Sequence, residues 1–167
     1  MNKLLMLVLF AGIMTGANAQ KERFKALFIY NFTKNIEWPP QVKSNHFIIG
    51  VVGNSDIAAE LQTIAQTQKV GNQTIKVING NSTDELEFCH LVFLSGNKTA
   101  QLPHLLTKLS GKQTLIITDG KNLAAKGSGI SFVQDGDKLK FEICRRNIEK
   151  QGLKSSSALA NLGIVVD

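Results

Sequence analysis

A nearly unbroken run of apolar residues occupies positions 46–53, with the sequence His46-Phe47-Ile48-Ile49-Gly50-Val51-Val52-Gly53. A strand with one face in water alternates polar and apolar side chains, whereas a continuous apolar run is typical of a strand covered on both faces. Further runs of this kind follow at residues 74–78, 90–95 and 114–118. The sequence therefore predicts a sheet buried between layers of other structure.

Helical periodicity occupies the segments between these runs. Residues 56–68 place Ile57, Leu61 and Ile64 on one side of a helix, and residues 102–109 do the same with four leucines. Strands that alternate with helices in this way predict right-handed βαβ units and a mainly parallel sheet.

The C-terminal part of the chain predicts a different arrangement. Residues 130–133 and 139–143 flank the turn Asp135-Gly136-Asp137. An Asp-Gly turn between two such segments predicts an antiparallel hairpin. Residues 145–166 are expected to form a helix, a turn at Gly152 and a second short helix. The predicted fold is thus a single α/β domain, with a mainly parallel sheet flanked by helices and a C-terminal antiparallel hairpin.

The first nineteen residues have the pattern of a secretory signal peptide. Lys3 supplies a positive charge, an apolar segment follows it, and small residues end the segment at Ala17-Asn18-Ala19. The apolar segment is about ten residues long, shorter than the ~20 that a membrane-spanning helix needs. We expect cleavage after Ala19, which separates a signal peptide at residues 1–19 from a domain at residues 20–167. This pattern favours export to the bacterial periplasm and argues against insertion of the domain into a membrane.

An aromatic helix is expected directly after the cleavage site, from Glu22 to Glu37. Its apolar positions follow helical spacing, and the sequence Trp38-Pro39-Pro40 ends it, because proline disfavours helical geometry in the residue before it. We expect three phenylalanines of this stripe to lie in the core, the alternative being an exposed interface: Phe24, Phe28 and Phe32. The lysines Lys25 and Lys34 lie off the stripe.

The residue patterns of catalytic and metal sites do not occur in this sequence. His46, His90 and His104 lack the spacing of metal ligands and have no paired carboxylate. Ser95 follows a predicted strand but lacks the G-x-S-x-G pattern of a nucleophile elbow. The glycines match neither the Rossmann nor the Walker phosphate loop. We therefore expect a protein without enzymatic activity, metal or cofactor.

A weak ligand-binding hypothesis attaches to Asn54 and Asp119. Both residues follow predicted parallel strands, and open α/β sheets bind ligands beyond the carboxyl ends of their strands. The alternative is that Asp119 is an ordinary turn residue.

The two cysteines, Cys89 and Cys144, leave two main alternatives open. In an oxidising compartment they could form a disulfide that stabilises the fold by roughly 3–4 kcal/mol on the chain-entropy estimate. They could equally be two buried thiols, and a redox-responsive or intermolecular cysteine is the minor third alternative.

The formal net charge of +6 raises the question of nucleic-acid binding. The basic residues are densest between Lys138 and Lys154, but Asp and Glu interrupt them and no aromatic stripe accompanies them. Together with the predicted export, this pattern argues against nucleic acid. The two interpretations that remain are a solvated surface and a docking patch for an acidic partner.

Two stretches resemble the YfiR family of periplasmic proteins, namely residues 24–39, which end in Glu37-Trp38-Pro39, and residues 129–159. Between them, residues 89–95 and 115–119 fall where that family has its middle strands. The resemblance implies a small α/β periplasmic regulator without catalytic activity. In this family YfiR represses an inner-membrane diguanylate cyclase, YfiN, through its periplasmic sensory domain, and a lipoprotein, YfiB, sequesters YfiR.

The resemblance and the residues together give two functional hypotheses. The first is a periplasmic repressor of a diguanylate cyclase of YfiN type, which lowers cyclic di-GMP and restrains biofilm formation, with a YfiB-type lipoprotein as a second partner. The alternative is a periplasmic protein that binds or senses a small ligand near Asn54 and Asp119. The sequence leaves open whether the protein forms a homodimer.

Overall fold

A computed structural model of the chain describes residues 3–40, 45–53, 55–86 and 88–167, with side chains from residue 18 onward except that of Ser55. Within these residues, one sheet contains eight strands in the order β10-β8-β7-β6-β5-β2-β4-β3. The parallel strands are β2 (His46–Val52), β4 (Gln73–Gly80), β5 (Leu91–Leu94), β6 (Leu115–Asp119) and β7 (Ile130–Asp135). The apolar runs of the sequence thus form the centre of the sheet, as predicted.

The parallel strands have a doubly wound order. From β2 the chain moves to β4 on one side, and it then returns to β5, β6 and β7 on the other side. The order β4-β2-β5-β6-β7 is that of flavodoxin-like folds, in which the direction of winding reverses between the first and third strands. In this protein the reversal lies between β2 and β5.

The edges of the sheet are formed by shorter or antiparallel strands. The predicted hairpin is confirmed, since β8 (Lys138–Ile143) pairs antiparallel with β7. The strand β10 (Ile164–Val165) runs parallel to β8 at one edge, and β3 (Lys69–Val70) runs antiparallel to β4 at the other. The fold class is therefore confirmed as a mixed α/β domain with a mainly parallel sheet.

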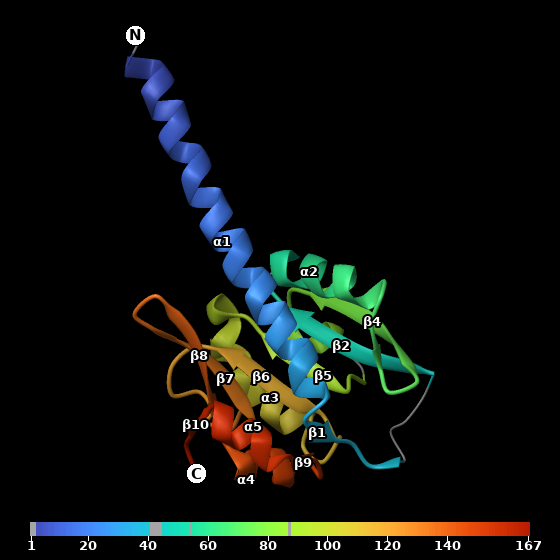
Figure 1. Cartoon of the computed structure of the whole chain (residues 1–167). Coiled ribbons are helices and arrows are strands. Elements are labelled where there is room, and N and C mark those ends of the chain that lie inside the picture. Colours follow the sequence, from blue (N-terminus) through green and yellow to red (C-terminus); the bar gives the residue numbers. More distant parts are fainter. Residues whose placement is uncertain (1–2, 41–44, 54, 87) are drawn as a thin grey trace.

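Helices cover both faces of the sheet. The larger core lies between one face and the helices α1 (Lys3–Thr33) and α2 (Ser55–Ala65), which lie side by side (Figure 1). The smaller core lies on the other face, against α3 (Leu102–Lys108). Alternate residues of each strand enter the two cores: in β5, Leu91 and Phe93 join the larger one, and Val92 and Leu94 join the smaller one. The remaining helical segments are η2 (Thr83–Glu85), η3 (Gly96–Gln101), α4 (Arg145–Lys150) and α5 (Ser157–Leu162).

The aromatic helix differs from its prediction at its C-terminal end. It ends at Thr33, and Ile36–Glu37 form a strand, β1, which pairs antiparallel with β9 (Lys154–Ser155). The predicted end at Glu37 is therefore wrong. Hydrogen bonds to a segment more than a hundred residues away outweigh the local helical periodicity, a contribution that no local pattern can reveal.

The aromatic helix is also rotated relative to the predicted stripe. Phe32 is buried and Phe28 packs against the core, as expected, and the Phe32 ring lies 4.9 Å from that of Phe141. Phe24, in contrast, is 49% exposed, and Lys25 is buried in its place. The buried face of the helix contains Lys25, Ala26, Ile29, Phe32 and Thr33.

Helix α1 begins at Lys3, within the predicted signal peptide. Its N-terminal half projects away from the sheet, and the contacts described above come from its C-terminal half (Figure 1). Within the part of the chain that the structure describes, none of the helices has both the length and the apolar character that crossing a bilayer requires. The division into residues 1–19 and 20–167 stays a prediction.

Candidate functional site

The carboxyl edge of the parallel sheet brings together residues that lie far apart in the sequence. Val52, Ser95 and Asp119 stand at or just beyond the ends of β2, β5 and β6, which are neighbours in the sheet. The ends of β2 and β5 form the point at which the winding of the sheet reverses. Doubly wound proteins bind their ligands at this position, which makes it a candidate functional site.

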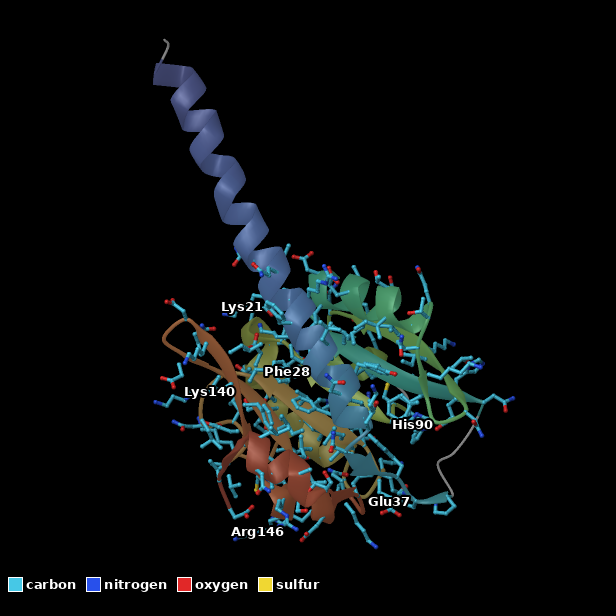
Figure 2. The ribbon with its side chains drawn as sticks, viewed as in Figure 1. Lys21, Phe28, Glu37, His90, Lys140 and Arg146 are labelled. Atoms are coloured by element: carbon cyan, nitrogen blue, oxygen red, sulfur yellow. The ribbon has the colours of Figure 1, made fainter. Side chains whose placement is uncertain are left out.

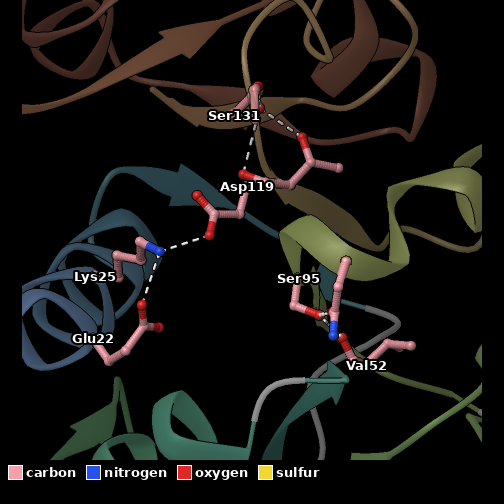
Figure 3. A network of polar contacts seen from close by, with 9 residues as sticks. Glu22, Lys25, Val52, Ser95, Asp119 and Ser131 are labelled. Carbon is pink, nitrogen blue, oxygen red and sulfur yellow. Dashed lines mark hydrogen bonds and ion pairs between the residues drawn. The ribbon is translucent and has the colours of Figure 1, made fainter. Parts of the chain in front are cut away.

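Asp119 is held by a lysine from helix α1. The Lys25 ammonium lies 2.6 Å from Asp119 Oδ2 and 3.0 Å from Glu22 Oε1, so it bridges the sheet and its own helix (Figure 3). The Lys25 side chain is only 4% exposed, whereas that of Asp119 is 26% exposed. Asp119, proposed from the sequence as a ligand contact, therefore serves as the anchor of α1 in this structure.

The pKa of Lys25 reflects two opposing effects. Burial by itself lowers the pKa, because it penalises the charged form, but the hydrogen bonds and attraction from Asp119 and Glu22 outweigh it. The result is a pKa raised above the ordinary 10.5. The folded protein thus holds the Lys25 proton more tightly than the unfolded chain does.

The reversal point next to Asp119 is filled by side chains of the chain itself. Ser95 Oγ lies 2.7 Å from the Val52 carbonyl oxygen and 2.7 Å from Asn97 Oδ1, which joins the ends of β2 and β5 (Figure 3). A side chain at Gly53 would meet Ser95 and the Lys98 stem, and one at Gly96 would approach the Asp119 carbonyl. Asn54, the second residue of the sequence hypothesis, lies outside the described residues.

A group of buried hydroxyls supports the turn after Asp119. Thr118 Oγ1 lies 2.9 Å from Ser128 Oγ and 2.8 Å from Ser131 Oγ, and Ser131 also donates to the Gly120 carbonyl. These hydroxyls bond to each other and to backbone carbonyls. They join β6 to β7 and do not have the arrangement of a serine nucleophile with its base.

The three histidines lie apart from one another. His46 contacts Thr74 at the start of β2, His104 forms a surface ion pair with Asp84, and His90 is buried beside β5. The His104 ring holds the pKa of Asp84 below its ordinary value. Among the described residues, no group of three or more His, Cys, Asp or Glu side chains is placed to hold a metal ion.

A pocket of about 650 Å³ opens at the opposite, amino edge of the sheet. Its inner wall is aromatic: the Trp38 and Phe47 rings meet edge to face with their centres 4.9 Å apart, and the Phe47 ring stacks on the His90 ring with a centre-to-centre distance of 4.7 Å.

The His90 ring is held by the backbone of β2. The Ile48 N–H donates to His90 Nδ1, which leaves the neutral ring with its proton on Nε2. The polar residues that line the pocket include Glu37, Asn45, Asn72 and Gln73. Figure 2 shows Glu37 and His90 away from the end of the domain where Lys21 lies.

The sequence prediction missed both the buried lysine and this pocket. Lys25 precedes Phe28 by three residues and Ile29 by four, a helical spacing that was compatible with the buried face, but the carboxylate that compensates its charge lies 94 residues away. The pocket has no comparable signal, because its wall comes from residues 33–38, 45–47, 70–73 and His90, which only the folded chain brings together.

The cysteines are both free and both buried. Cys89 precedes β5 and Cys144 follows β8, and the strands β6 and β7 lie between them in the sheet. Three strand spacings separate them by about 14 Å, whereas a disulfide requires Cα atoms within about 7 Å. This geometry favours the alternative of two buried thiols over the bridge.

The sequence model of a protein family described as YfiR/HmsC-like matches residues 22–163. The match spans every element of the domain from the buried half of α1 to α5. The chain belongs to the YfiR/HmsC-like family. The YfiR-like family is periplasmic and regulatory rather than catalytic, and it is associated with diguanylate cyclase signalling and with signalling partner proteins.

A solved structure shows a similar fold. It is an ABC domain from Streptococcus pneumonia in complex with L-Trp, with a TM-score of 0.52 at 16% sequence identity. The similarity covers 77% of this chain and 57% of that chain, so this protein spans little more than half of that protein's length. At this identity the likeness concerns the fold alone. A search of curated proteins finds no match.

We predict that replacing Lys25 with Met lowers the free energy of unfolding by about 1.5–3 kcal/mol, the contribution of hydrogen bonds to charged groups. Because the folded pKa of Lys25 is raised, this contribution is fully present below pH 10.5 and is lost as the pH rises through the raised pKa. Urea unfolding of both proteins between pH 8 and pH 12 measures it. Lys112→Met, an exposed lysine beyond α3, is the control and should stay within about 0.5 kcal/mol of wild type. A wild-type advantage that persists unchanged above the raised pKa would contradict this account.

We predict that the protein carries two reactive thiols once it is unfolded without a reductant. Burial raises the pKa of Cys89 to about 11, despite the opposing effect of Lys108, so this thiol is largely protonated at neutral pH and shielded from reagents. Labelling with iodoacetamide should be slow in buffer and complete at both cysteines in guanidinium chloride. If labelling in guanidinium requires prior reduction, Cys89 and Cys144 form a disulfide, and the distance of about 14 Å between them is wrong.

Proposed function

We propose that this protein is a periplasmic repressor of an inner-membrane diguanylate cyclase of YfiN type. By repressing the cyclase it lowers cyclic di-GMP and restrains biofilm formation. The observation that carries the proposal is the family match over residues 22–163, which includes every strand of the large sheet except β10 and the helices on both faces. A YfiB-type lipoprotein is the second proposed partner.

The structure of the carboxyl edge supports action by binding rather than by catalysis. Its polar groups bond to one another: Asp119 to Lys25, and Ser95 to Val52 and Asn97. A protein without catalysis changes the activity of a partner by binding one of its conformational states more tightly than the other. Moving a partner from almost fully active to almost fully inactive requires a difference of about 5.5 kcal/mol between those affinities.

Repression also requires that the protein reaches the periplasmic side of the membrane. Residues 1–19 are proposed to direct export and then to be removed. The domain that remains begins two residues before Glu22, so it keeps the whole Lys25 network. The proposed site of action is therefore the periplasm, where the sensory domain of such a cyclase lies.

We predict that deleting the gene raises cellular cyclic di-GMP and increases biofilm. Expression of the full chain from a plasmid should restore the low level. A chain that lacks residues 2–19 should fail to restore it, because the protein then stays in the cytoplasm. Cyclic di-GMP is measured by mass spectrometry of cell extracts. An unchanged level in the deletion strain would exclude the proposed function.

The pocket at the amino edge supports a second candidate function, the binding of a small ligand. Its volume of about 650 Å³ lies in the range of small-molecule sites, and its aromatic wall with a few polar groups is typical of them. Because Asp119 is engaged by Lys25, this pocket is a better location for a ligand than the Asn54 and Asp119 crevice.

We predict that, if the second candidate is correct, a small ligand raises the thermal unfolding midpoint of the exported protein. The probes are the L-amino acids, including the L-tryptophan bound by the structurally similar ABC domain. The matched variant is Asn72→Leu, which changes the exposed rim of the pocket and leaves the buried aromatic wall intact. A shift in wild type that is absent in this variant supports the pocket, whereas an equal shift in both places the ligand elsewhere.

A further inference from the structure

The outer face of helix α1 exposes two large apolar side chains close to the proposed start of the exported domain. Phe24 is 49% exposed and Leu27 is 40% exposed, and their spacing of three residues places them next to each other on the helix. They are exposed because the buried face of α1 is fixed by Lys25 at one end and by Phe32 at the other.

Two hollows flank this part of α1. One, of about 400 Å³, lies between α1 and the hairpin of β7 and β8, and Phe24 lines it. The other, of about 640 Å³, lies between α1 and α2, and Leu27 lines it together with Tyr30 and Ile64. Helix α1 thus forms a ridge with apolar side chains between two concavities.

The charge along this ridge is positive. Arg23 is exposed and Lys21 half-buried on this part of α1, and the exposed Lys34 directly follows the helix, with its ammonium 4.4 Å from the centre of the Tyr30 ring. Glu22 is the only acidic residue among the first 36, and it is engaged by the buried Lys25. The nearest carboxylates on the far walls of the two hollows are Asp137 and Glu60.

We infer that the outer face of α1, defined by Lys21, Arg23, Phe24 and Leu27, is the docking surface for an acidic segment of a protein partner that carries an apolar anchor. The inference rests on the proposed function, since a repressor must contact its sensor. Acidic groups of the partner lie along the ridge, where the exposed charge of α1 is positive. Asp137 and Glu60 repel the acidic groups of the partner from the walls of the hollows that face α1, and this repulsion fixes the register of the partner.

The hollows favour a protein partner over a lipid surface. A flat membrane surface would contact the ridge and leave both concavities empty. Side chains of a protein partner fill such concavities, and well-packed apolar anchors of this kind supply most of the binding energy of protein interfaces. Charge complementarity along the ridge would mainly accelerate association.

The test is the double variant Arg23→Glu with Phe24→Ser, expressed as the full chain in the deletion strain. Both side chains are exposed, so the exported variant should fold and unfold thermally like wild type. The matched control is Lys112→Glu, which makes the same charge reversal at an exposed position beyond α3, the helix on the opposite face of the sheet.

The expected result is that the double variant leaves cyclic di-GMP at the high level of the deletion strain, while Lys112→Glu restores the low level. Immunoblots of periplasmic extracts check that both proteins are present. If the double variant represses as fully as wild type, the docking surface is wrong, although the proposed function stands. If the deletion itself leaves cyclic di-GMP unchanged, the proposed function fails instead.

A second measurement separates a protein partner from the membrane. The exported wild-type protein is sedimented with phosphatidylglycerol vesicles and compared with the double variant. We expect wild type to remain in the supernatant. Vesicle binding by wild type that the double variant loses would overturn the inference in favour of a lipid surface.

Discussion

The ion pair between Lys25 and Asp119 determines how helix α1 lies on the sheet. A lysine buried away from water is costly unless a carboxylate compensates its charge, so α1 is held in the rotation that brings Lys25 to Asp119. That rotation places Ile29 and Phe32 in the core and leaves Phe24 and Leu27 outside. The packing of α1 in the larger core, its ion pair at the carboxyl edge and the exposed ridge thus belong to one rotation of this helix.

The two edges of the sheet differ in whether their polar side chains are engaged by the protein itself. At the carboxyl edge, where related architectures bind ligands, the side chains of this protein bond to each other. At the amino edge, the wall of Trp38, Phe47 and His90 stays open to a pocket. A family that acts through partner proteins has no need of a catalytic carboxyl edge. The doubly wound enzymes have the same strand order but bind their ligands at the carboxyl edge, which is closed by side chains in this protein.

Much of the fold followed from the sequence because its signals are local. Continuous apolar runs indicated the buried strands, and the Asp-Gly turn indicated the hairpin. The missed features depend on contacts between distant segments. Ile36 and Glu37 form a strand because β9 lies beside them, and Lys25 is buried because Asp119, 94 residues later, is there to receive it. At the candidate site, the residue type of Asp119 and its place at the strand end were predictable, but its partner was not.

The small sheet of β1 and β9 joins the start of the domain to its end. Ile36 lies opposite Ser155, and the Ser156 N–H donates to the Asn35 carbonyl, so the first and last parts of the domain are bound together. Contacts between segments so distant in sequence form late and slow the folding of a chain. If the chain crosses a membrane from its N-terminus onward, as proposed above, this closure means that the domain stays incomplete until β9 has passed. A chain exported in this way would remain in a form that can be translocated until that point.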